Sequence, residues 1–210
     1  MSIQIKNEIQ LEIAHVLFID IVGYSKLSIS DQHAAVEELT RIVRASEEFQ
    51  RAEAASRLTR IPTGDGMVLV FYTSPESPVR CAVEISRALK QQPRLQLRMG
   101  IHSGPVSGVV DVNEQANLAG AGLNIAHRVM ACCDAGHILL SKHVAEDLEG
   151  YQGQELLRRV MGRDGLLLYS KTTRDRLAES VKCNRDTIRS MPTGLISGAA
   201  KGIIGAQTAP

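Results

Sequence analysis

The chain has 210 residues, of which 44% are hydrophobic, and its formal net charge is +1 at pH 7. This length predicts one domain with a sizeable core and leaves room for a tail. The near-zero charge argues against binding to nucleic acid or a membrane surface, and the absence of Trp, with aromatic residues at 3%, argues against a platform that stacks single strands.

The N-terminus and the cysteines indicate a cytoplasmic protein. The N-terminus lacks a basic region followed by an uncharged apolar run, so we predict no signal peptide. No apolar stretch reaches the ~20 residues that span a bilayer. None of the four cysteines forms a C-x-x-C pair, and the two adjacent ones are poor disulfide partners. We therefore expect reduced thiols at Cys81, Cys132, Cys133 and Cys183.

The N-terminal part predicts a strand, a helix and a hairpin. Residues 14–20 form an apolar run typical of a buried strand. Residues 30–49 place apolar side chains on one helical stripe and begin with two possible N-cap residues, Ser30 and Asp31. Residues 56–72 hold two strand-like runs around a Gly-Asp-Gly turn, which is a strong hairpin signal.

The following segments continue the alternation. A second helix is expected up to Pro93. Residues 95–112 predict a strand, a Ser-Gly-Pro turn and a second strand. Residues 120–136 predict a third helix with Gly136 near its end. A short strand, a short helix and a last strand are expected at residues 137–141, 141–149 and 165–170.

This order predicts the fold class and the domain boundaries. A β-α-β-β-α-β order with β-α-β additions is typical of an α+β fold of the ferredoxin-like type. We expect this domain to cover residues 1–172. Residues 173–210 contain a Gly/Ala-rich, weakly apolar run and predict a C-terminal tail that is mobile or loosely docked.

Two aspartates stand out in these elements. Asp20 interrupts the first apolar strand, and Asp65 lies in the predicted hairpin turn. A buried carboxylate is costly unless it is paired, hydrogen-bonded or bound to a metal. If the first and third strands are neighbours, the turn approaches the end of the first strand, and the two carboxylates form a site for Mg²⁺ or Mn²⁺. Taken alone, each aspartate is explained more simply, Asp20 as a cap of the following loop and Asp65 as a turn former.

Three further features suit a phosphate ligand. Residues 22–25 (V-G-Y-S), directly after Asp20, offer backbone N–H groups as a cradle. Asn124 and Arg128 are spaced i, i+4 and project from one helix face, where an Arg beside an amide suits charge that develops on phosphate oxygens. Arg98 interrupts an apolar strand. The simpler interpretations are a solvated helix face and an edge-strand charge.

Together these stretches resemble the catalytic domain of the class III nucleotidyl cyclases, over about residues 13–170. "FIDIVGYSKL" is similar to the first metal motif of that family, and "TGDGMVLVF" to the second. "LRMGIHSGPV" resembles its central strand, and "GAGLNIAHRVMACCDAGHILLS" the segment that bears its transition-state residues. Four motifs in the right order and spacing are specific. The resemblance implies a mixed, largely antiparallel sheet flanked by helices, in a homodimer.

The resemblance also implies roles for the candidate residues. Asp20 and Asp65, aided by the carbonyl of Ile21, would hold two divalent cations per site, Mn²⁺ or Mg²⁺. Asn124 would orient the ribose, and Arg128 would neutralise the pentavalent phosphorus. The expected triphosphate contacts are Gly23, Tyr24, Ser25, Arg98 and Arg163.

The implied reaction is attack of the ribose 3′-OH on the α-phosphate, which yields a 3′,5′-cyclic nucleotide and pyrophosphate. In this family the metal residues come from one subunit and the Asn/Arg pair comes from the other. A lone domain must therefore form a homodimer with two symmetric sites.

The base-reading positions depart from both purine codes. Adenylate cyclases place a Lys three residues before the Gly of the GD turn and an Asp seven residues before the Asn, and guanylate cyclases usually place Glu and a small polar residue there. This chain has Ile61 and Asn117 at these positions, and Leu118 is the third expected base contact. Ile61 offers no hydrogen bond. Asn117 can donate to a carbonyl such as uracil O4 or guanine O6, although a flipped amide accepts instead.

Short free-standing cyclases without purine codes resemble the pyrimidine cyclases of bacterial anti-phage defence. We therefore expect conversion of UTP to cyclic UMP, a second messenger for a separate effector protein. The alternatives left open are a cytidylate, guanylate or adenylate cyclase with an atypical base pocket, and a catalytically inactive dimer that only binds nucleotide. The presence of all four metal and transition-state residues argues against the inactive dimer.

Overall fold

The computed structural model describes residues 11–92, 94–110, 116–150 and 166–167. The chain divides into two units, Met1–Ser170 and Lys171–Pro210, and every described residue belongs to the first. The expected boundary at residue 172 and the expected tail lie outside the described residues and stay predictions.

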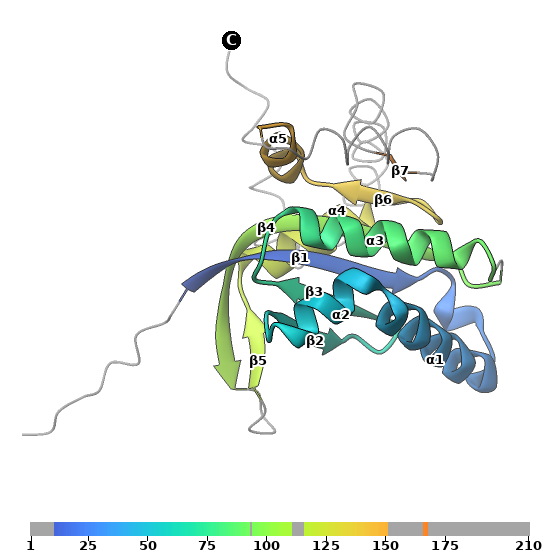
Figure 1. The fold of residues 1–210 in the computed structure, drawn as a ribbon. Helices are drawn as coiled ribbons and strands as arrows, with labels where there is room; N and C mark the ends of the chain where they lie inside the picture. Colours follow the sequence, from blue (N-terminus) through green and yellow to red (C-terminus); the bar gives the residue numbers. More distant parts are fainter. Residues whose placement is uncertain (1–10, 93, 111–115, 151–165, 168–210) are drawn as a thin grey trace, which may run out of the picture. The chain divides into compact units, whose positions relative to one another are not determined.

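A seven-stranded sheet organises the first unit (Figure 1). Its strand order is β2-β3-β1-β4-β6-β7, and β5 pairs with β4 off this path. The first five strands pair antiparallel, whereas β6 runs parallel to β4 and to β7. The predicted α+β fold, with the first and third strands as neighbours, is confirmed. The strands are β1 (Leu11–Ile21), β2 (Leu58–Pro62), β3 (Gly66–Phe71), β4 (Leu97–Val110), β5 (Ala116–Ala119), β6 (Ile138–Leu140) and β7 (Leu166–Leu167).

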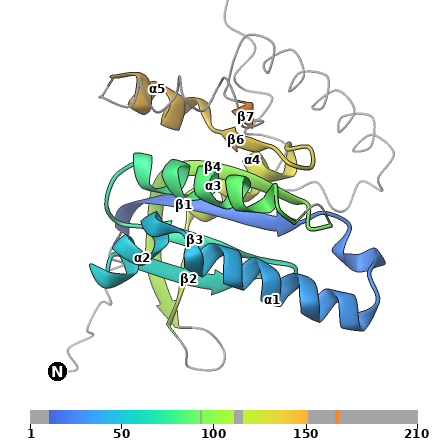
Figure 2. The same ribbon diagram turned by 45° about the vertical axis from the view of Figure 1, so that its right-hand side comes forward.

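Helices cover both faces of this sheet. Helices α1, α2 and α3 lie on one face and α4 lies on the other (Figure 2). A short 3₁₀ helix, η1, follows β1. The helices are η1 (Tyr24–Lys26), α1 (Ile29–Ala45), α2 (Glu47–Ala54), α3 (Glu76–Leu89), α4 (Ala121–Ala131) and α5 (Lys142–Gly150).

The helix predicted over residues 30–49 is in fact two helices. Its N-cap is Ser28, not Ser30 or Asp31, because the Ser28 hydroxyl accepts the N–H of Asp31 at 3.2 Å. The chain turns at Ser46, whose Oγ accepts the N–H of Phe49 and caps the start of α2. A serine side chain that satisfies a backbone N–H starts a new helix at this point.

The Ser-Gly-Pro turn predicted within residues 95–112 is wrong, because one continuous strand, β4, runs from Leu97 to Val110 through it. Its residues from Leu97 to Ser107 pair with β1, including Pro105 opposite Ile13. In the described part of the chain, the other edge of β4 has no partner between Ile101, which pairs with β6, and Ser107, which pairs with β5. A proline is tolerated there because its missing N–H removes no ladder bond. The true hairpin partner is β5, which the sequence pattern did not reveal.

Two predicted helix ends are also displaced. Helix α3 ends at Leu89, before Pro93, and α4 ends at Ala131, well before Gly136. Gly136 instead has a left-handed φ of 80° in the turn to β6, where its N–H donates to the carbonyl of Leu97 at 2.7 Å. Glycine favours this turn because it adopts positive φ without strain.

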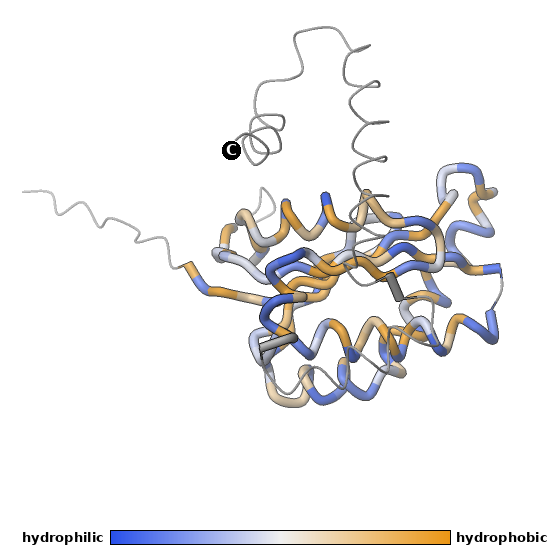
Figure 3. Tube along the Cα trace, turned by 90° about the horizontal axis from the view of Figure 1, so that it is seen from above, coloured by the Kyte–Doolittle hydropathy of each residue, from blue (hydrophilic) through white to orange (hydrophobic). Residues whose placement is uncertain are grey.

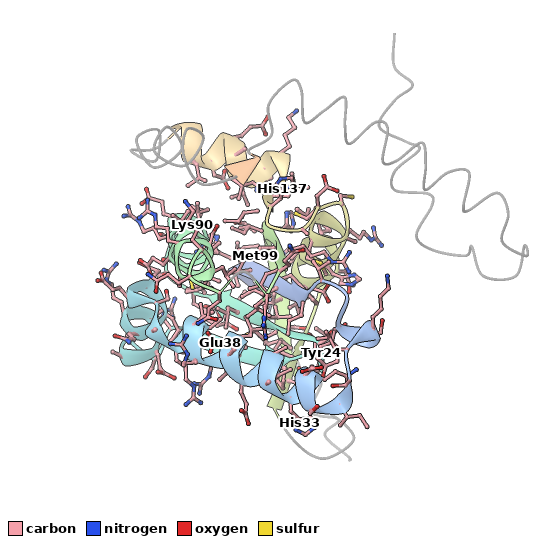
Figure 4. All side chains as sticks on the ribbon, turned by 90° about the vertical axis from the view of Figure 1, so that its right-hand side faces the viewer. Tyr24, His33, Glu38, Lys90, Met99 and His137 are labelled. Atoms are coloured by element: carbon pink, nitrogen blue, oxygen red, sulfur yellow. The ribbon has the colours of Figure 1, made fainter. Side chains whose placement is uncertain are left out.

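Each face of the sheet carries its own apolar cluster. Leu17, Ile19 and Met99 belong to the cluster under α1 to α3, and Figure 4 shows Met99 in the interior. Val16 belongs to the cluster under α4, with Phe18 packed against it. The hydrophobic colour in Figure 3 accordingly follows the central strands. Because side chains alternate along a strand, Asp20 shares the α4 face with Val16 and Phe18.

Helix α4 packs closely against the sheet because glycines, which have no side chain, lie at their contact. A Cβ on Gly100 would lie 2.2 Å from the backbone nitrogen of Met130, and a Cβ on Gly104 would lie 3.1 Å from the Cα of Gly122. Larger residues at Gly100 would therefore push α4 away from β4. The buried residues of α4 face the strands and its other side stays exposed.

The described residues include no helix that is both long and apolar enough to cross a membrane. Cys81, Cys132 and Cys133 are free thiols, and Cys183 lies outside the described residues.

Candidate active site

The end of β1 and the turn between β2 and β3 form one edge of the site. In the sheet, Asp20 is paired with Gly66 of β3 on one side and with Arg98 of β4 on the other. The N–H of Ile21 donates to the carbonyl of Asp65 at 3.0 Å, which fastens the turn to the strand end. We call Asp20, Ile21, Asp65 and Arg98 the metal edge.

Glycine at position 66 makes this close approach possible. A Cβ there would lie 2.1 Å from the carbonyl oxygen of Ile19, a distance that no real side chain tolerates. The Gly-Asp-Gly turn therefore brings Asp65 beside Asp20 only because Gly66 carries no side chain.

The electrostatics of the metal edge favour a cation. Asp20 is buried, with 7% of its surface exposed. Burial raises the pKa of the Asp20 carboxyl, Arg98 lowers this pKa through its hydrogen bond and charge, and Asp65 raises it again through charge and a shared hydrogen bond. Two carboxylates in contact repel each other when both are ionised, and a divalent cation between them relieves that repulsion.

Arg98 supplies the positive charge at this edge. Its Nε donates to Oδ2 of Asp20 at 2.6 Å, and its side chain is 36% exposed. The simpler interpretation of Arg98, as a charge on an edge strand, is wrong because β4 lies inside the sheet between β1 and β6.

The residues present fit a hard cation, although they do not enclose one. Carboxylate and carbonyl oxygens are the ligands that Mg²⁺ and Mn²⁺ prefer, and Asp20, Asp65 and Ile21 supply such atoms. The described residues contain no group of three or more His, Cys, Asp or Glu that could hold a metal ion. Substrate phosphates commonly complete such a two-carboxylate site.

The loop after β1 follows the metal edge. Gly23 has a left-handed φ of 75° and precedes η1. Gly23 and Ser25 are exposed, whereas Tyr24 packs against the core under α1 (Figure 4). Arg163 lies outside the described residues.

Asn124 and Arg128 lie on the exposed side of α4, one helical turn apart. Among the described residues, neither side chain forms a hydrogen bond or ion pair with Asp20 or Asp65. Between them on the helix, His127 makes an edge-to-face ring contact with Phe18, with centroids 5.0 Å apart. This contact was not expected from the sequence. The one sequence signal was that Phe18 precedes Asp20 by two residues in the same strand, which places both side chains on one face.

Two of the three expected base contacts, Ile61 and Leu118, lie on the α4 face of the sheet. Ile61 of β2 and Leu118 of β5 both pack against the apolar cluster under α4, together with Tyr72. Leu118 and Tyr72 also line one pocket of about 420 Å³. Asn117 precedes Leu118, and its Oδ1 accepts the N–H of Leu118 at 2.8 Å. Tyr72 was not a candidate from the sequence, because an aromatic at the end of a strand is common.

Comparison with known proteins assigns this arrangement to a family. The profile of the adenylate and guanylate cyclase catalytic domain matches residues 7–169. The chain belongs to this family, and its fold is that of a class III cyclase catalytic domain.

Individual relatives agree with this assignment. A protein of Rhizobium meliloti (strain 1021) named "Putative adenylate cyclase 3" is 29% identical over 154 residues, which are 69% of this chain and 25% of that protein. The chain therefore spans about a quarter of the length of this curated relative. The guanylate cyclase domain of RhGC from Catenaria anguillulae, solved in complex with GTP, is 25% identical with a TM-score of 0.57, and the match covers 67% of this chain and 85% of that one.

A further solved structure supports the fold alone. A double mutant of the guanylyl cyclase domain of the RhoGC fusion protein, from the aquatic fungus Blastocladiella emersonii, is 24% identical with a TM-score of 0.58. The match covers 68% of this chain and 86% of that chain.

Proposed function

We propose that this chain is a homodimeric nucleotidyl cyclase, which converts a nucleoside triphosphate to a 3′,5′-cyclic nucleotide and pyrophosphate. The observation that carries this proposal is the metal edge. Asp20 and Asp65 lie side by side at the end of β1 with Arg98 at 2.6 Å from Asp20, in a chain of the cyclase family.

The metal edge binds the triphosphate end of the substrate. Asp20, Asp65 and the carbonyl of Ile21 would hold two divalent cations, Mn²⁺ or Mg²⁺. When bound, these cations activate the ribose 3′-OH and stabilise the leaving pyrophosphate. Arg98 and the backbone N–H groups of Gly23 and Ser25, which are exposed residues, would contact phosphate oxygens beside these cations.

The second half of each site comes from the other subunit. Asn124 and Arg128 are exposed on α4 and make no contact with the metal edge of their own chain in the described part of the structure. A two-fold dimer would present this helix face of one chain to the metal edge of its partner. Arg128 would then stabilise charge on the reacting phosphate, and Asn124 would orient the ribose.

Asn117 supports a base that presents a carbonyl. The Asn117 oxygen accepts the N–H of Leu118 at 2.8 Å, and this bond orients the amide so that its NH₂ group points away from the Leu118 backbone. In this orientation the NH₂ group is the part of Asn117 that we assign to the base, and an NH₂ group can only donate. A donor suits uracil O4 and guanine O6, and it opposes the exocyclic amines of adenine and cytosine.

Ile61 favours uracil over guanine. Ile61 offers no acceptor, so a polar N–H of the base that faces it stays unpaired, which costs free energy in a buried site. Guanine carries N1–H and an NH₂ group on this edge, whereas uracil carries only N3–H. We therefore propose UTP as the preferred substrate and cyclic UMP as the product. GTP is the second candidate, since a relative of similar fold was solved with GTP.

The cellular role follows from the resemblance to pyrimidine cyclases of anti-phage defence. On that basis we propose that cyclic UMP acts as a second messenger on a separate effector protein in the cytoplasm.

A competition among the four nucleotides tests this function. Purified protein is incubated with equimolar ATP, GTP, CTP and UTP and Mn²⁺, and cyclic products are identified by mass. Cyclic UMP should predominate. Cyclic GMP as the main product would contradict the role of Ile61, and cyclic AMP would contradict that of Asn117 as well. No cyclic product from a folded dimer would leave only the nucleotide-binding alternative.

A further inference from the structure

Arg98 occupies a carboxylate that the proposed function needs for a cation. Its Nε donates to Oδ2 of Asp20 at 2.6 Å, a charge-assisted hydrogen bond. Asp65 lies in the turn beside this end of β1, where its carbonyl accepts the N–H of Ile21 at 3.0 Å. One oxygen of the buried Asp20 carboxyl group is therefore already engaged by a cationic protein group.

A divalent cation cannot join this arrangement without cost. It would bind Asp20 and Asp65 together and would bring two positive charges next to the guanidinium. Like charges at contact distance repel strongly in a partly buried site. The cation and Arg98 therefore compete for the same carboxylate.

The position of Arg98 allows an exchange of partners. Its backbone is held opposite Asp20 by the β1–β4 ladder, so only the side chain has to move. That side chain is 36% exposed, and only its Nε is used in the ion pair with Asp20. The two terminal NH₂ groups of the guanidinium form a planar fork that matches phosphate oxygens.

We propose that Arg98 is a positioning residue with two alternative partners, Asp20 in the cation-free protein and the triphosphate in the loaded one, so that nucleotide binding frees Asp20 for the cation. This inference rests on the proposed function, because it takes the metal edge as the cation site. It goes beyond that function in making cation affinity depend on the nucleotide.

The test is Mn²⁺ binding to the nucleotide-free protein, followed by the loss of the electron paramagnetic resonance signal of free Mn²⁺. Arg98→Gln should bind Mn²⁺ about tenfold more tightly than wild type, because the competing cation is gone. Arg98→Lys keeps the charge and should stay near wild type. Arg80→Gln removes an arginine from an ion pair with Glu76 on α3, which covers the opposite face of the sheet, and should change nothing.

The sign of the effect separates exchange from a structural role, because damage to the site would weaken Mn²⁺ binding. Equal or weaker binding by Arg98→Gln would overturn the proposal. A measurement on wild-type protein needs no variant to fold: the Nε–H resonance of Arg98 should shift as Mg²⁺ is added, and an unchanged resonance at saturating Mg²⁺ would also overturn it.

Asp20→Asn distinguishes failure of this inference from failure of the proposed function. If wild type and Arg98→Gln bind Mn²⁺ equally and Asp20→Asn does not bind it, only the exchange is wrong. If Asp20→Asn binds Mn²⁺ as well as wild type does, the cation site of the proposed function fails, and the exchange fails with it.

Discussion

The metal edge and the exposed side of α4 carry the two halves of the candidate site, and they differ in burial and in the partners of their side chains. At the metal edge, Asp20 is buried and hydrogen-bonded to Arg98, and the turn with Asp65 is fastened to the same strand end. On α4, Asn124 and Arg128 are exposed. The first half is organised within one chain, by strand pairing. The second half is carried by helix α4, and among the described residues its two side chains form no hydrogen bond or ion pair.

This difference bears on how the site would be completed. Strand neighbours bring Asp20 and Arg98 together whenever the sheet forms, so the metal edge needs no partner to take shape. A helix face gains its ligand contacts only when another surface meets it. Disruption of the metal edge should therefore act inside one chain, whereas disruption of the α4 face should be repaired by a second chain.

The largest effect is expected from the metal edge itself. Asp20→Asn or Asp65→Asn should lower the cyclisation rate more than about a hundredfold, since each removes a charged ligand of the cation. Asp134→Asn removes an exposed carboxylate just after α4 and should keep wild-type activity. Rates are measured as cyclic nucleotide formed in Mn²⁺, and circular dichroism checks the fold. Wild-type rates in either site variant would contradict the two-cation reaction.

Complementation tests the division between the two regions. Asp65→Ala and Arg128→Ala should each be inactive alone. An equimolar mixture should recover about a quarter of wild-type activity, because half of the randomly exchanged dimers are mixed and each has one of two sites intact. Two Asp65→Ala preparations mixed together serve as the control. Absence of recovery, with subunit exchange demonstrated by labelled chains, would show that the halves do not meet across an interface.

A glycine substitution should break the metal edge by sterics alone. Gly66→Ala places a Cβ 2.1 Å from the carbonyl oxygen of Ile19 and should lower the free energy of unfolding by about 2 kcal/mol. Gly108→Ala on β4 meets no atom within 4 Å and should be nearly neutral. Urea unfolding measures both. Equal stability of the two variants would show that the turn does not depend on the missing side chain.

Substitution of the expected base contact Asn117, which lies outside both the metal edge and α4, should change activity less. Asn117→Asp replaces the donating NH₂ group by an acceptor and should reduce kcat/KM for UTP about tenfold. The same variant should gain activity with CTP, whose exocyclic amine can donate. Asn117→Ser keeps a donor and should retain the order of preference. An Asn117→Asp enzyme with unchanged UTP and CTP rates would exclude Asn117 from base recognition.

The smallest expected effect is a pH dependence of folding stability, which arises from two histidines on β1 and β4, the strands that carry Asp20 and Arg98. Burial lowers the pKa of His102 on β4 and of His15 on β1 below the ordinary 6.5. The unfolded chain then binds protons that the folded chain excludes, so stability is complete above pH 6.5 and is lost as the pH falls below it. Thermal unfolding should show a Tm that drops between pH 7 and pH 5.

Substitution locates this pH effect. His102→Gln should flatten the Tm profile, because Gln carries no proton-linked charge. His33→Gln, on the exposed side of α1 (Figure 4), should leave it unchanged. A profile as steep in His102→Gln as in wild type would assign the pH dependence to other groups.

Local signals in the sequence anticipated much of the metal edge. The Gly-Asp-Gly turn between two apolar runs indicated a hairpin, and the structure has that hairpin as β2 and β3. Once β3 lies beside β1, the turn with Asp65 has to approach Asp20. The i, i+4 spacing of Asn124 and Arg128 likewise placed both on one side of a helix.

Other features did not follow from local pattern. The Ser-Gly-Pro run predicts a turn on its own, yet β4 continues through it because β1 pairs with β4 from Leu97 to Ser107. Strand β5 has the sequence Ala-Asn-Leu-Ala, which carries no β-branched or aromatic residue, and it forms because β4 offers it an edge. The role of Arg98 as partner of Asp20 was equally invisible, since 78 residues separate them.

The sequence by itself therefore determined the features whose cause is local. These are the strand, hairpin and helix patterns, the position of Asp65 in the hairpin turn, and the residue types that suit phosphate and a cation. The tertiary structure alone decided which of those residues share an environment. It buried Asp20, set Arg98 against it, and turned the oxygen of Asn117 toward the N–H of Leu118. The physical reason is that periodicity and turn propensity act over a few residues, whereas burial and charge pairing depend on strands that are distant in the chain and adjacent in space.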